Sequence, residues 1–220
     1  MARPRSEGKR NAILDAAAEV VAELGIGAPT ARIAKDAGVA EGTLFTYFAT
    51  KDELLNQLYL MLKLDLREAM MSGYPAGKSL IDRGRHIWNG FVGWGTANPL
   101  KRKAMVQLAV SDRITENNKK LGNEAFGEIY EMLRESLASG VLKDHPPAFA
   151  AAIMSAIADT TMDFIAREPG HAKQYTKAGF DAFWKAINKY EAFFFARVMS
   201  ECVFIHGALN EKETICQKFG

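Results

Sequence analysis

The sequence has little of several features that would point to a class of function. It holds only two cysteines in 220 residues, Cys202 and Cys216, which is too few for a disulfide scaffold and fits a reducing compartment. Seven prolines and the lack of a regular repeat argue against a collagen-like or solenoid chain. The net charge is +2, from 28 basic and 26 acidic residues, so the whole chain gives no sign of a nucleic-acid partner.

Long apolar runs are also absent from the sequence. The nearest candidate, residues 192–209, is interrupted by Arg197, Glu201 and His206. The first seven residues are basic, but the apolar stretch that follows the basic region of a signal peptide is missing. We therefore expect no spanning helix, no membrane partner and a cytoplasmic location.

The residue patterns of catalytic and metal sites are missing as well. The histidines are scattered without metal-ligand spacing: His86, His145, His171 and His206. No Gly-x-Ser-x-Gly sequence is present for a nucleophile. Asp159 and Asp163 are one helical turn apart, but such pairs are more often a solvated face than an acid–base pair. We expect no enzyme, no catalytic residue, no metal and no cofactor.

What the sequence does contain is a helical period from end to end. Apolar residues between Ile13 and Leu24 recur at helical spacing, and Gly25 ends them. Short segments follow at 30–37 and 41–48, and then a long one at 51–71. Further helices are expected near 79–96, 100–111, 118–139, 147–167 and 172–190, separated by proline, glycine or Ser-Asp pairs.

No alternating strand pattern appears, so the predicted fold is all-α. We expect a three-helix helix-turn-helix head at 1–50 and an antiparallel helical body at 51–190. Residues 191–220 are apolar in places and form an extension of unknown role, which contains both cysteines. Whether Cys202 or Cys216 is redox-active is left open, and idle thiols are the simpler interpretation.

The segment 30–48 is the most informative part of the chain. Thr30 stands where it could cap a helix, Gly38 lies at the turn, and Val39 is expected to point into the core. Leu44 and Phe48, four residues apart, give the second helix an apolar face. This pattern is typical of two short helices that cross steeply, with the second exposed to a DNA groove, although similar turns occur in many helical proteins.

The wider context of this segment resembles a known family. The residues Ile13-Leu14, Ala16-Ala17, Gly25, Thr30, Ile33-Ala34, Ala37-Gly38-Val39, Gly42-Thr43-Leu44-Phe45, Tyr47-Phe48, Lys51 and Leu54 resemble the N-terminal domain of TetR-family repressors. Many members have tyrosine where this chain has Phe45. The resemblance implies a homodimer that binds double-stranded operator DNA through its head and a small-molecule effector through its body.

Further segments resemble the RamR-type regulators of that family, which control multidrug-efflux activation. These are Ala2-Arg3-Pro4, 40–45, 47–54, Ile87-Trp88-Asn89, 107–111 and 160–164. The resemblance ends near Ile187. It implies a ligand pocket at Tyr59, Lys63, Met70, Trp88, Met105, Leu133, Ser136 and Met154.

The predicted DNA contacts combine the resemblance with the local charge. Residues 1–50 hold six basic and six acidic side chains, so only a local basic rim is available. Thr30, Tyr47 and Lys51 are expected at phosphates, and Gly42 allows close backbone approach. Thr43 and Thr46 are expected at base edges. The remaining expected contacts are basic: Arg3, Arg5, Arg10 and Arg32.

The predicted pocket leaves two ligand classes open. Tyr59 and Lys63 are four residues apart on one helix face, and Tyr59 with Trp88 could stack on a planar cation. Met154, however, stands where the relatives have their stacking aromatic, and Ala151 where they have an acid. A fatty acid or bile-acid-like molecule is then equally expected, with Lys63 as partner for its carboxylate.

The sequence therefore predicts a ligand-responsive repressor that controls efflux or stress genes. The resemblance implies dimerisation through the helices at 147–167 and 172–190. The alternatives are a helical small-molecule-binding protein or an enzyme whose head binds no DNA. The effector, the operator and the regulated genes are not fixed by the sequence.

Overall fold

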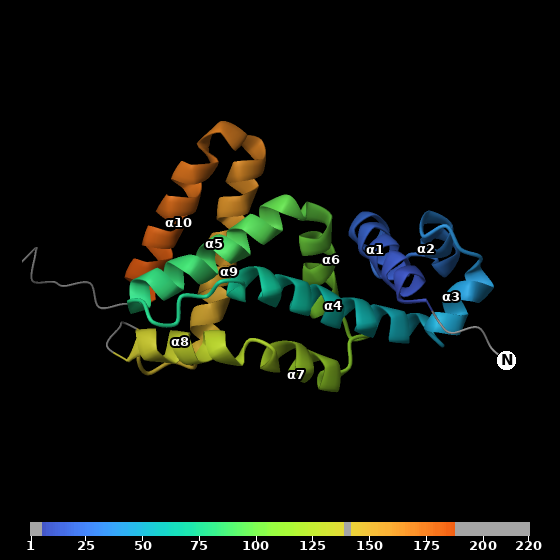
Figure 1. The fold of residues 1–220 in the computed structure, drawn as a ribbon, viewed down its shortest axis with the longest axis horizontal. Helices are drawn as coiled ribbons and strands as arrows, with labels where there is room; N and C mark the ends of the chain where they lie inside the picture. Colours follow the sequence, from blue (N-terminus) through green and yellow to red (C-terminus); the bar gives the residue numbers. More distant parts are fainter. Residues whose placement is uncertain (1–5, 139–141, 188–220) are drawn as a thin grey trace, which may run out of the picture.

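The computed structural model describes residues 6–138 and 142–187. Over these residues the chain is all-α, as predicted, with ten α-helices, one 3-10 turn and no strand. Three helices, α1 (Glu7–Leu24) and the shorter α2 (Thr30–Asp36) and α3 (Glu41–Tyr47), form one end of the molecule (Figure 1). The residues at 1–5, with the predicted contacts Arg3 and Arg5, and the extension at 191–220 lie outside the described part.

One long helix, α4 (Lys51–Met71), runs from the head into the body (Figure 1). Its start is fixed by Thr50, whose hydroxyl oxygen accepts a 3.0 Å hydrogen bond from the Glu53 backbone N–H. The Glu53 carboxylate in turn accepts from the Ala49 N–H at 2.8 Å. This reciprocal cap satisfies backbone donors that the first turn of a helix leaves without partners. The head therefore joins the body through a capped helix rather than a loose linker.

The body contains six further α-helices, most of them at the predicted positions. Their bounds are α5 Leu80–Ala97, α6 Pro99–Ala109, α7 Glu116–Glu124, α8 Gly127–Leu137, α9 Pro147–Arg167 and α10 Ala172–Ile187, with the 3-10 turn at Pro169–His171. The single helix expected at 118–139 is wrong, because α7 and α8 are separate. The Ala125 carbonyl accepts a 2.7 Å hydrogen bond from Nε of Arg67, so it is not used inside a continuous helix.

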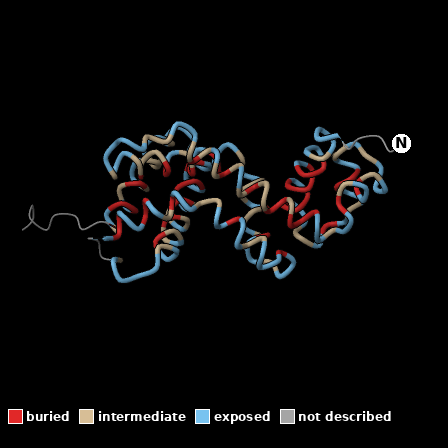
Figure 2. Tube along the Cα trace, turned by 60° about the horizontal axis from the view of Figure 1, so that its bottom comes forward, coloured by how far each residue is buried: buried red, intermediate tan, exposed pale blue. Residues whose placement is uncertain are grey.

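Buried residues form two groups along the molecule (Figure 2). The first holds the inner faces of α1 to α3, the first half of α4, and Ala104, Leu108 and Ile114 from the α6 region. The second holds the end of α4 with α5, α8, α9 and α10. Met105 packs against both groups. The core of the head therefore extends beyond residue 50 into the body.

The α2–α3 turn has the geometry that its sequence predicts. Gly38 has φ +67°, a left-handed conformation that costs a side chain energy. Val39 follows and packs against the head core. The expected cap at Thr30 is wrong: Pro29 is the N-cap of α2, and no side chain caps it. Proline before the helix removes the preceding N–H donor, and Thr30 is already the first helical residue.

A buried polar node joins α4 to the segment before α7. Asn56 is 6% exposed, and its side-chain amide nitrogen donates to the carbonyl oxygens of Asp52 and Arg113 at 2.7 and 2.8 Å. Its side-chain oxygen accepts from the Thr115 N–H and the Asn118 amide at 3.0 and 2.7 Å. All the hydrogen-bonding capacity of the two N–H groups is used, as burial of an amide requires. Asn56 thus fixes α7 on the helix that begins at the head.

The helix α9 is more apolar than expected, because the sequence predicted no segment that could span a membrane. In the described part of the chain it alone is long and apolar enough to cross a membrane, with a third of that window buried. Core helices of globular proteins meet the same criterion, and α9 packs against α5, α8 and α10. Its apolar exposed face includes Phe149 and Phe164, which are 47% and 41% exposed.

The crossing of α4 and α5 depends on a glycine. A Cβ atom at Gly90 would lie 2.4 Å from the Ala69 carbonyl oxygen and 2.7 Å from the Cα of Met70. Both obstacles are backbone atoms, so no side-chain rotation could relieve the clash. The two helices can approach this closely only because Gly90 has no side chain.

We expect Gly90→Ala to lower the free energy of unfolding by about 1–3 kcal/mol, because the helices must separate. Urea denaturation followed by circular dichroism measures the change. Gly93→Ala, on the same helix, is the matched control, since a Cβ there meets nothing within 4 Å. Alanine should stabilise that exposed helical position by up to about 1 kcal/mol. Equal effects at the two positions would contradict the close crossing.

We expect Asn56→Leu to destabilise the protein by about 1–3 kcal/mol, because the Arg113 carbonyl and the Thr115 N–H would lose their buried partner. Asn89→Leu is the control, since Asn89 is exposed on α5. Thermal unfolding of the two variants compares them, and hydrogen exchange at Thr115 reports the node directly. Unchanged exchange at Thr115 in Asn56→Leu would rule out this role.

Candidate DNA-binding surface and ligand cavity

The outer face of α3 carries most of the residues predicted to contact DNA. Gly42 and Thr46 are exposed, and Thr43 is half-buried. A Cβ at Gly42 would meet nothing within 4 Å, so its surroundings are open. The Thr46 hydroxyl donates to the Thr43 carbonyl at 2.6 Å, and its oxygen can still accept a hydrogen bond. Leu44 and Phe48 are buried on the opposite face.

Tyr47 and Arg10 link the start of α1 to the helices that follow. The Tyr47 hydroxyl accepts a 3.0 Å hydrogen bond from the Ser6 backbone N–H. Nη2 of Arg10 donates to Oε1 of Gln57 at 2.9 Å, and its guanidinium lies 5.7 Å from the centre of the Phe48 ring. The segment that leads to the basic residues at 1–5 is therefore attached beside α3. Arg10 itself is engaged within the protein rather than free in solution.

Two other predicted contacts are bound by acids. The Thr30 hydroxyl donates to Oε1 of Glu41 at 2.6 Å. Arg32 lies 2.7 Å from Asp36 and 3.8 Å from Glu23, and the hydrogen bond to Asp36 raises the pKa of Arg32. These exposed pairs contribute little to stability, but a phosphate would have to compete with them. Arg32 and Asp36 are four residues apart on α2, a spacing that the sequence shows, whereas the contacts of Thr30 with Glu41 and of Arg32 with Glu23 join different helices and depend on the fold.

Lys51 lies at the first residue of α4, as predicted. It is half-buried, and this burial, together with the positive charge of Arg113, lowers its pKa. Arg113 itself pairs with Asp52 at 2.9 Å. Lys51 and Arg113 therefore place two cations at the N-terminus of α4, just after the end of α3. The N-terminus of a helix also favours an anion. Arg113 comes from the loop after α6, so its nearness to Lys51 could not be found from local spacing.

The sequence reasoning also missed an exposed aromatic on α3. Phe45 is 41% exposed, while its neighbour Leu44 is the buried residue of α3. It lies on the same helix as Thr46 and Gly42. An exposed apolar group on a groove-facing helix is suited to contact with a thymine methyl group.

A largely apolar cavity of about 130 Å³ lies in the body. It is lined by Lys63, Leu66, Met70, Phe91, Met105, Phe126, Ile129, Tyr130, Leu133, Ala151, Met154 and Ser155. Five of the eight residues predicted for a ligand pocket are among them. A cavity of about 150 Å³ accommodates benzene, so a larger ligand would require the methionines to move.

Lys63 is the charged group of this cavity. Its ammonium lies 5.7 Å from the centre of the Tyr59 ring and 5.2 Å from that of Phe126, both within cation–π range. The nearest hydrogen-bond acceptor is Oδ1 of Asn123, at 3.4 Å on α7. Burial lowers the pKa of Lys63. The ammonium therefore has weak partners where it stands, and an anion in the cavity would compensate it.

The other three predicted pocket residues lie in the packed core. The Trp88 ring is fully buried, stacks on Phe183 at 6.0 Å between centroids, and donates its indole N–H to the Thr176 carbonyl at 2.9 Å. Tyr59 is 3% exposed beside Lys63 but does not line the cavity. The Ser136 hydroxyl donates to the Met132 carbonyl of its own helix at 2.9 Å. These positions would reach a ligand only if the cavity enlarged.

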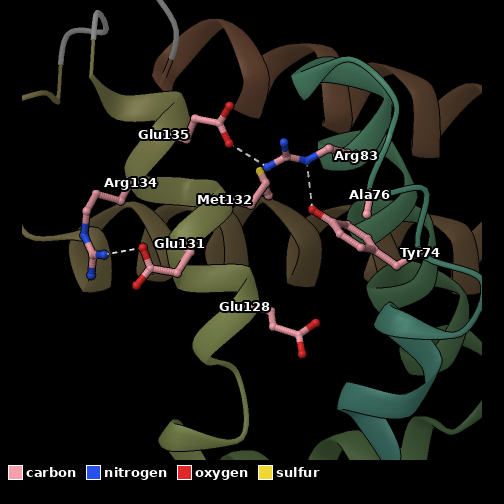
Figure 3. Close-up of a pocket in the computed structure, with 8 residues that line it drawn as sticks. All are labelled: Tyr74, Ala76, Arg83, Glu128, Glu131, Met132, Arg134 and Glu135. Carbon is pink, nitrogen blue, oxygen red and sulfur yellow. Dashed lines mark hydrogen bonds and ion pairs between the residues drawn. The ribbon is translucent and has the colours of Figure 1, made fainter.

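A larger hollow of about 680 Å³ opens between the loop after α4, the start of α5 and α8 (Figure 3). Its charged groups all have ion-pair partners, and only Glu128 has its partner, Arg67, outside the lining, at 3.4 Å. Arg83 donates to the Tyr74 hydroxyl at 3.0 Å and to Glu135 at 2.7 Å, and Arg134 pairs with Glu131. Because these charges are already compensated, the apolar cavity at Lys63 is the stronger candidate for a ligand site.

The outer faces of α9 and α10 form an apolar groove. It measures about 480 Å³ and is lined by Ala156, Ile157, Thr160, Thr161, Phe164, Tyr175, Ala178 and Gly179. The two acids of α9 weighed as an acid–base pair, Asp159 and Asp163, both bind Arg102, at 3.2 and 2.6 Å. In the described ranges, no three His, Cys, Asp or Glu side chains are arranged to hold a metal.

The helix α7 connects the cavity to the start of α4. Near its first turn, Thr115 and Asn118 bind Asn56. At its other end, Asn123 accepts from Lys63 and the Ala125 carbonyl accepts from Arg67. Along α4, Lys63 lies about three turns from Lys51, and α7 provides a second connection that reaches α4 at Asn56.

Comparison with known proteins supports this assignment of the head. The family described as bacterial regulatory proteins, tetR family, matches residues 13–58. The fatty acid metabolism regulator protein of Bacillus subtilis (strain 168) is 48% identical over 48 residues. That match covers 21% of this chain and 25% of the relative, so it concerns a DNA-binding domain rather than the whole protein.

Solved structures share the fold over most of the chain. A tetR family transcription regulator from Shewanella sp. PV-4 has a TM-score of 0.74 and 28% identity, over 84% of this chain and 100% of that one. LfrR from Mycobacterium smegmatis, solved with proflavine, has a TM-score of 0.61 and 21% identity, over 84% and 99% of the two chains. These proteins are regulators rather than enzymes. The tetR-family model thus matches the head, and over most of its length the chain shares the fold of solved tetR family transcription regulators.

Proposed function

We propose that the protein is a ligand-responsive repressor, which binds a palindromic operator as a homodimer and is released by a small amphipathic anion. The observation that carries the proposal is the arrangement along α4. Its first residue, Lys51, follows the last residue of α3 by four positions, and its Lys63 lines a largely apolar cavity. One helix therefore joins a surface suited to DNA and a site suited to a ligand.

DNA binding is supported by the exposed face of α3 and by its cationic base. Gly42, Thr43 and Thr46 offer a small, polar surface of the kind that fits a major groove. Lys51 and Arg10, with the basic residues at 1–5, would contact phosphates at its edges. Arg32 would contribute after exchange of its acidic partners.

Dimerisation is supported by the apolar groove on α9 and α10. Small residues such as Ala156 and Ala178 would let helices of a second copy approach closely, and Phe164 would be covered. A two-fold axis there would repeat the head for a palindromic site. The apolar exposed face of α9 is then an interface rather than a membrane contact.

The ligand class is argued from the charge of the cavity. Lys63 is a cation with aromatic rings and one weak amide contact around it, so a carboxylate or a similar anion would be favoured there. The remaining lining is apolar, with three methionines that can adapt to different shapes. An alkyl carboxylate fits both properties better than a planar cation does.

Release from DNA would follow from a shift of α7. An anion at Lys63 would draw the ammonium from Asn123 and change how the end of α7 packs on α4. Asn56 would carry that change to the segment beside Lys51 and α3. The resemblance to RamR-type regulators supports efflux or stress genes as the targets, and the protein would act in the cytoplasm.

DNA binding can be tested by selecting sequences from a randomised duplex library with the full-length protein. We expect enrichment of a palindrome. Lys51→Ala should weaken binding to the enriched and to scrambled DNA alike and reduce the salt slope by about one, because a phosphate contact is lost. Thr43→Ala should weaken binding to the enriched sequence more than to scrambled DNA.

Lys120→Ala is the control for these variants, since Lys120 is 74% exposed on α7. It should bind like the wild type. If Lys51→Ala and Thr43→Ala also bind like the wild type, the DNA surface has been assigned wrongly. If no sequence is enriched, the chain is a helical ligand-binding protein of another kind.

The ligand class can be tested with octanoate and proflavine as probes in isothermal titration calorimetry. We expect octanoate to bind and Lys63→Met to weaken it at least tenfold, because the anion loses its partner. Met154→Trp should block both probes by filling the cavity. Lys120→Met is the control for the change of charge. Binding of proflavine but not octanoate would contradict the proposed anion.

A further inference from the structure

The first residue of α3, Glu41, is an acid on the surface that the proposed function assigns to DNA. It is exposed and is the one charged residue of the α3 sequence, EGTLFTY. Phosphates repel a carboxylate, so an acid at this position lowers general affinity for DNA. Its presence on a helix assigned to the DNA groove therefore suggests a role in sequence-specific binding, because it does not favour sequence-independent binding.

Glu41 is held in a defined orientation by a residue of another helix. Its Oε1 accepts a 2.6 Å hydrogen bond from the Thr30 hydroxyl, at the first residue of α2. A carboxylate has about four acceptor sites, so this bond leaves most of them available. A long side chain that is fixed in this way loses less entropy when it makes a further contact. Thr30 is therefore a positioning residue for Glu41.

The chemistry of base edges identifies what such a carboxylate can bind. In the major groove, cytosine presents an N4 amino donor, which aspartate and glutamate accept. Guanine presents the acceptors N7 and O6, and thymine presents O4, all of which repel a carboxylate. Adenine presents a donor at N6 beside an acceptor at N7, and glutamine or asparagine is its matching partner. The N-terminal residues of a recognition helix are those that reach base edges.

We propose that Glu41 determines operator sequence by accepting a hydrogen bond from the N4 amino group of a cytosine in each half-site. This inference rests on the proposed DNA binding and goes beyond it by naming a base and its reader. The selectivity has two parts: attraction to the cytosine amino group, and repulsion of the bases that present acceptors at the same place. The carboxylate therefore lowers the general affinity for DNA but increases the discrimination between bases.

A purely structural role of Glu41 makes a different prediction. The bond between Thr30 and Glu41 joins α2 to α3, and removing it could loosen the head. Glu41→Gln separates the two roles, because the glutamine amide oxygen can still accept from Thr30 while its NH₂ group adds a donor. If the residue acts only through the fold, this variant should select the same DNA as the wild type.

The experiment is selection from a randomised duplex library by the full-length protein and its variants. For the wild type we expect cytosine at one position of each half-site. Glu41→Ala should lose that preference by about fivefold to a hundredfold at that position alone. Glu41→Gln should shift the preference there from cytosine to adenine. Thr30→Val should weaken it without changing the preferred base.

Glu19→Gln is the matched control, because it removes the same charge from an exposed position on α1. It should enrich the wild-type sequence. Thermal unfolding of every variant checks that the head is folded, and Glu41→Gln is expected to melt close to the wild type.

The outcomes separate this inference from the proposed function. If the wild type selects a palindrome and the Glu41 variants select the same bases at every position, Glu41 reads no base and the inference is wrong, while the DNA-binding function stands. If the wild type selects nothing, both fail. A change of base preference confined to one position per half-site, absent from Glu19→Gln, supports it.

Discussion

The helix α4 belongs to both hydrophobic cores, and the other features of the protein depend on this constraint. Its 21 residues span about 31 Å, and their hydrogen bonds keep the two halves in fixed register. The half near Leu54 and Leu58 closes the head, and the half near Leu66 and Met70 lines the body. A rotation or shift imposed on one half is therefore transmitted to the other. The buried Asn56 adds α7 to this arrangement, so that the cavity and the head share two connections rather than one.

The sequence predicted the helical architecture well because its signals are local. Apolar spacing and the Gly38 turn each depend on a few neighbouring residues, and the bounds of α4 and α9 agree with the predicted ones. The break between α7 and α8 depends on Arg67, which lies 58 residues away in the chain. Trp88 was expected at a ligand because of the family resemblance, yet its indole N–H donates to a backbone carbonyl of α10. Such outcomes depend on which helices meet, and one sequence does not contain that information locally.

The charge that the head presents to DNA depends on which of its polar side chains are already paired within the protein. Its acids and bases balance in number, but in the structure several predicted DNA contacts are compensated within the protein. Arg32 is bound by Asp36 and Glu23, and Thr30 by Glu41. Nearby, Lys51 and Arg113 stand close enough for their charges to interact. A surface of this kind has less non-specific attraction for DNA than its basic residues alone would give, so that affinity depends more on sequence.

The residues that complete the head core lie far along the chain. Ala104, Leu108 and Ile114 cover the inner face of α1, so the apolar surface of the head is not closed by residues 1–50 alone. This dependence of the head on α6 limits which gene segments can be exchanged by recombination during evolution. If a gene segment encoding only α1 to α3 were fused to another protein, the encoded head would expose part of its hydrophobic core. The new protein would have to supply a helix like α6 to cover it. The unit that evolution can exchange as a whole is thus discontinuous in sequence, and readers and sensors joined in this way are expected to diverge together.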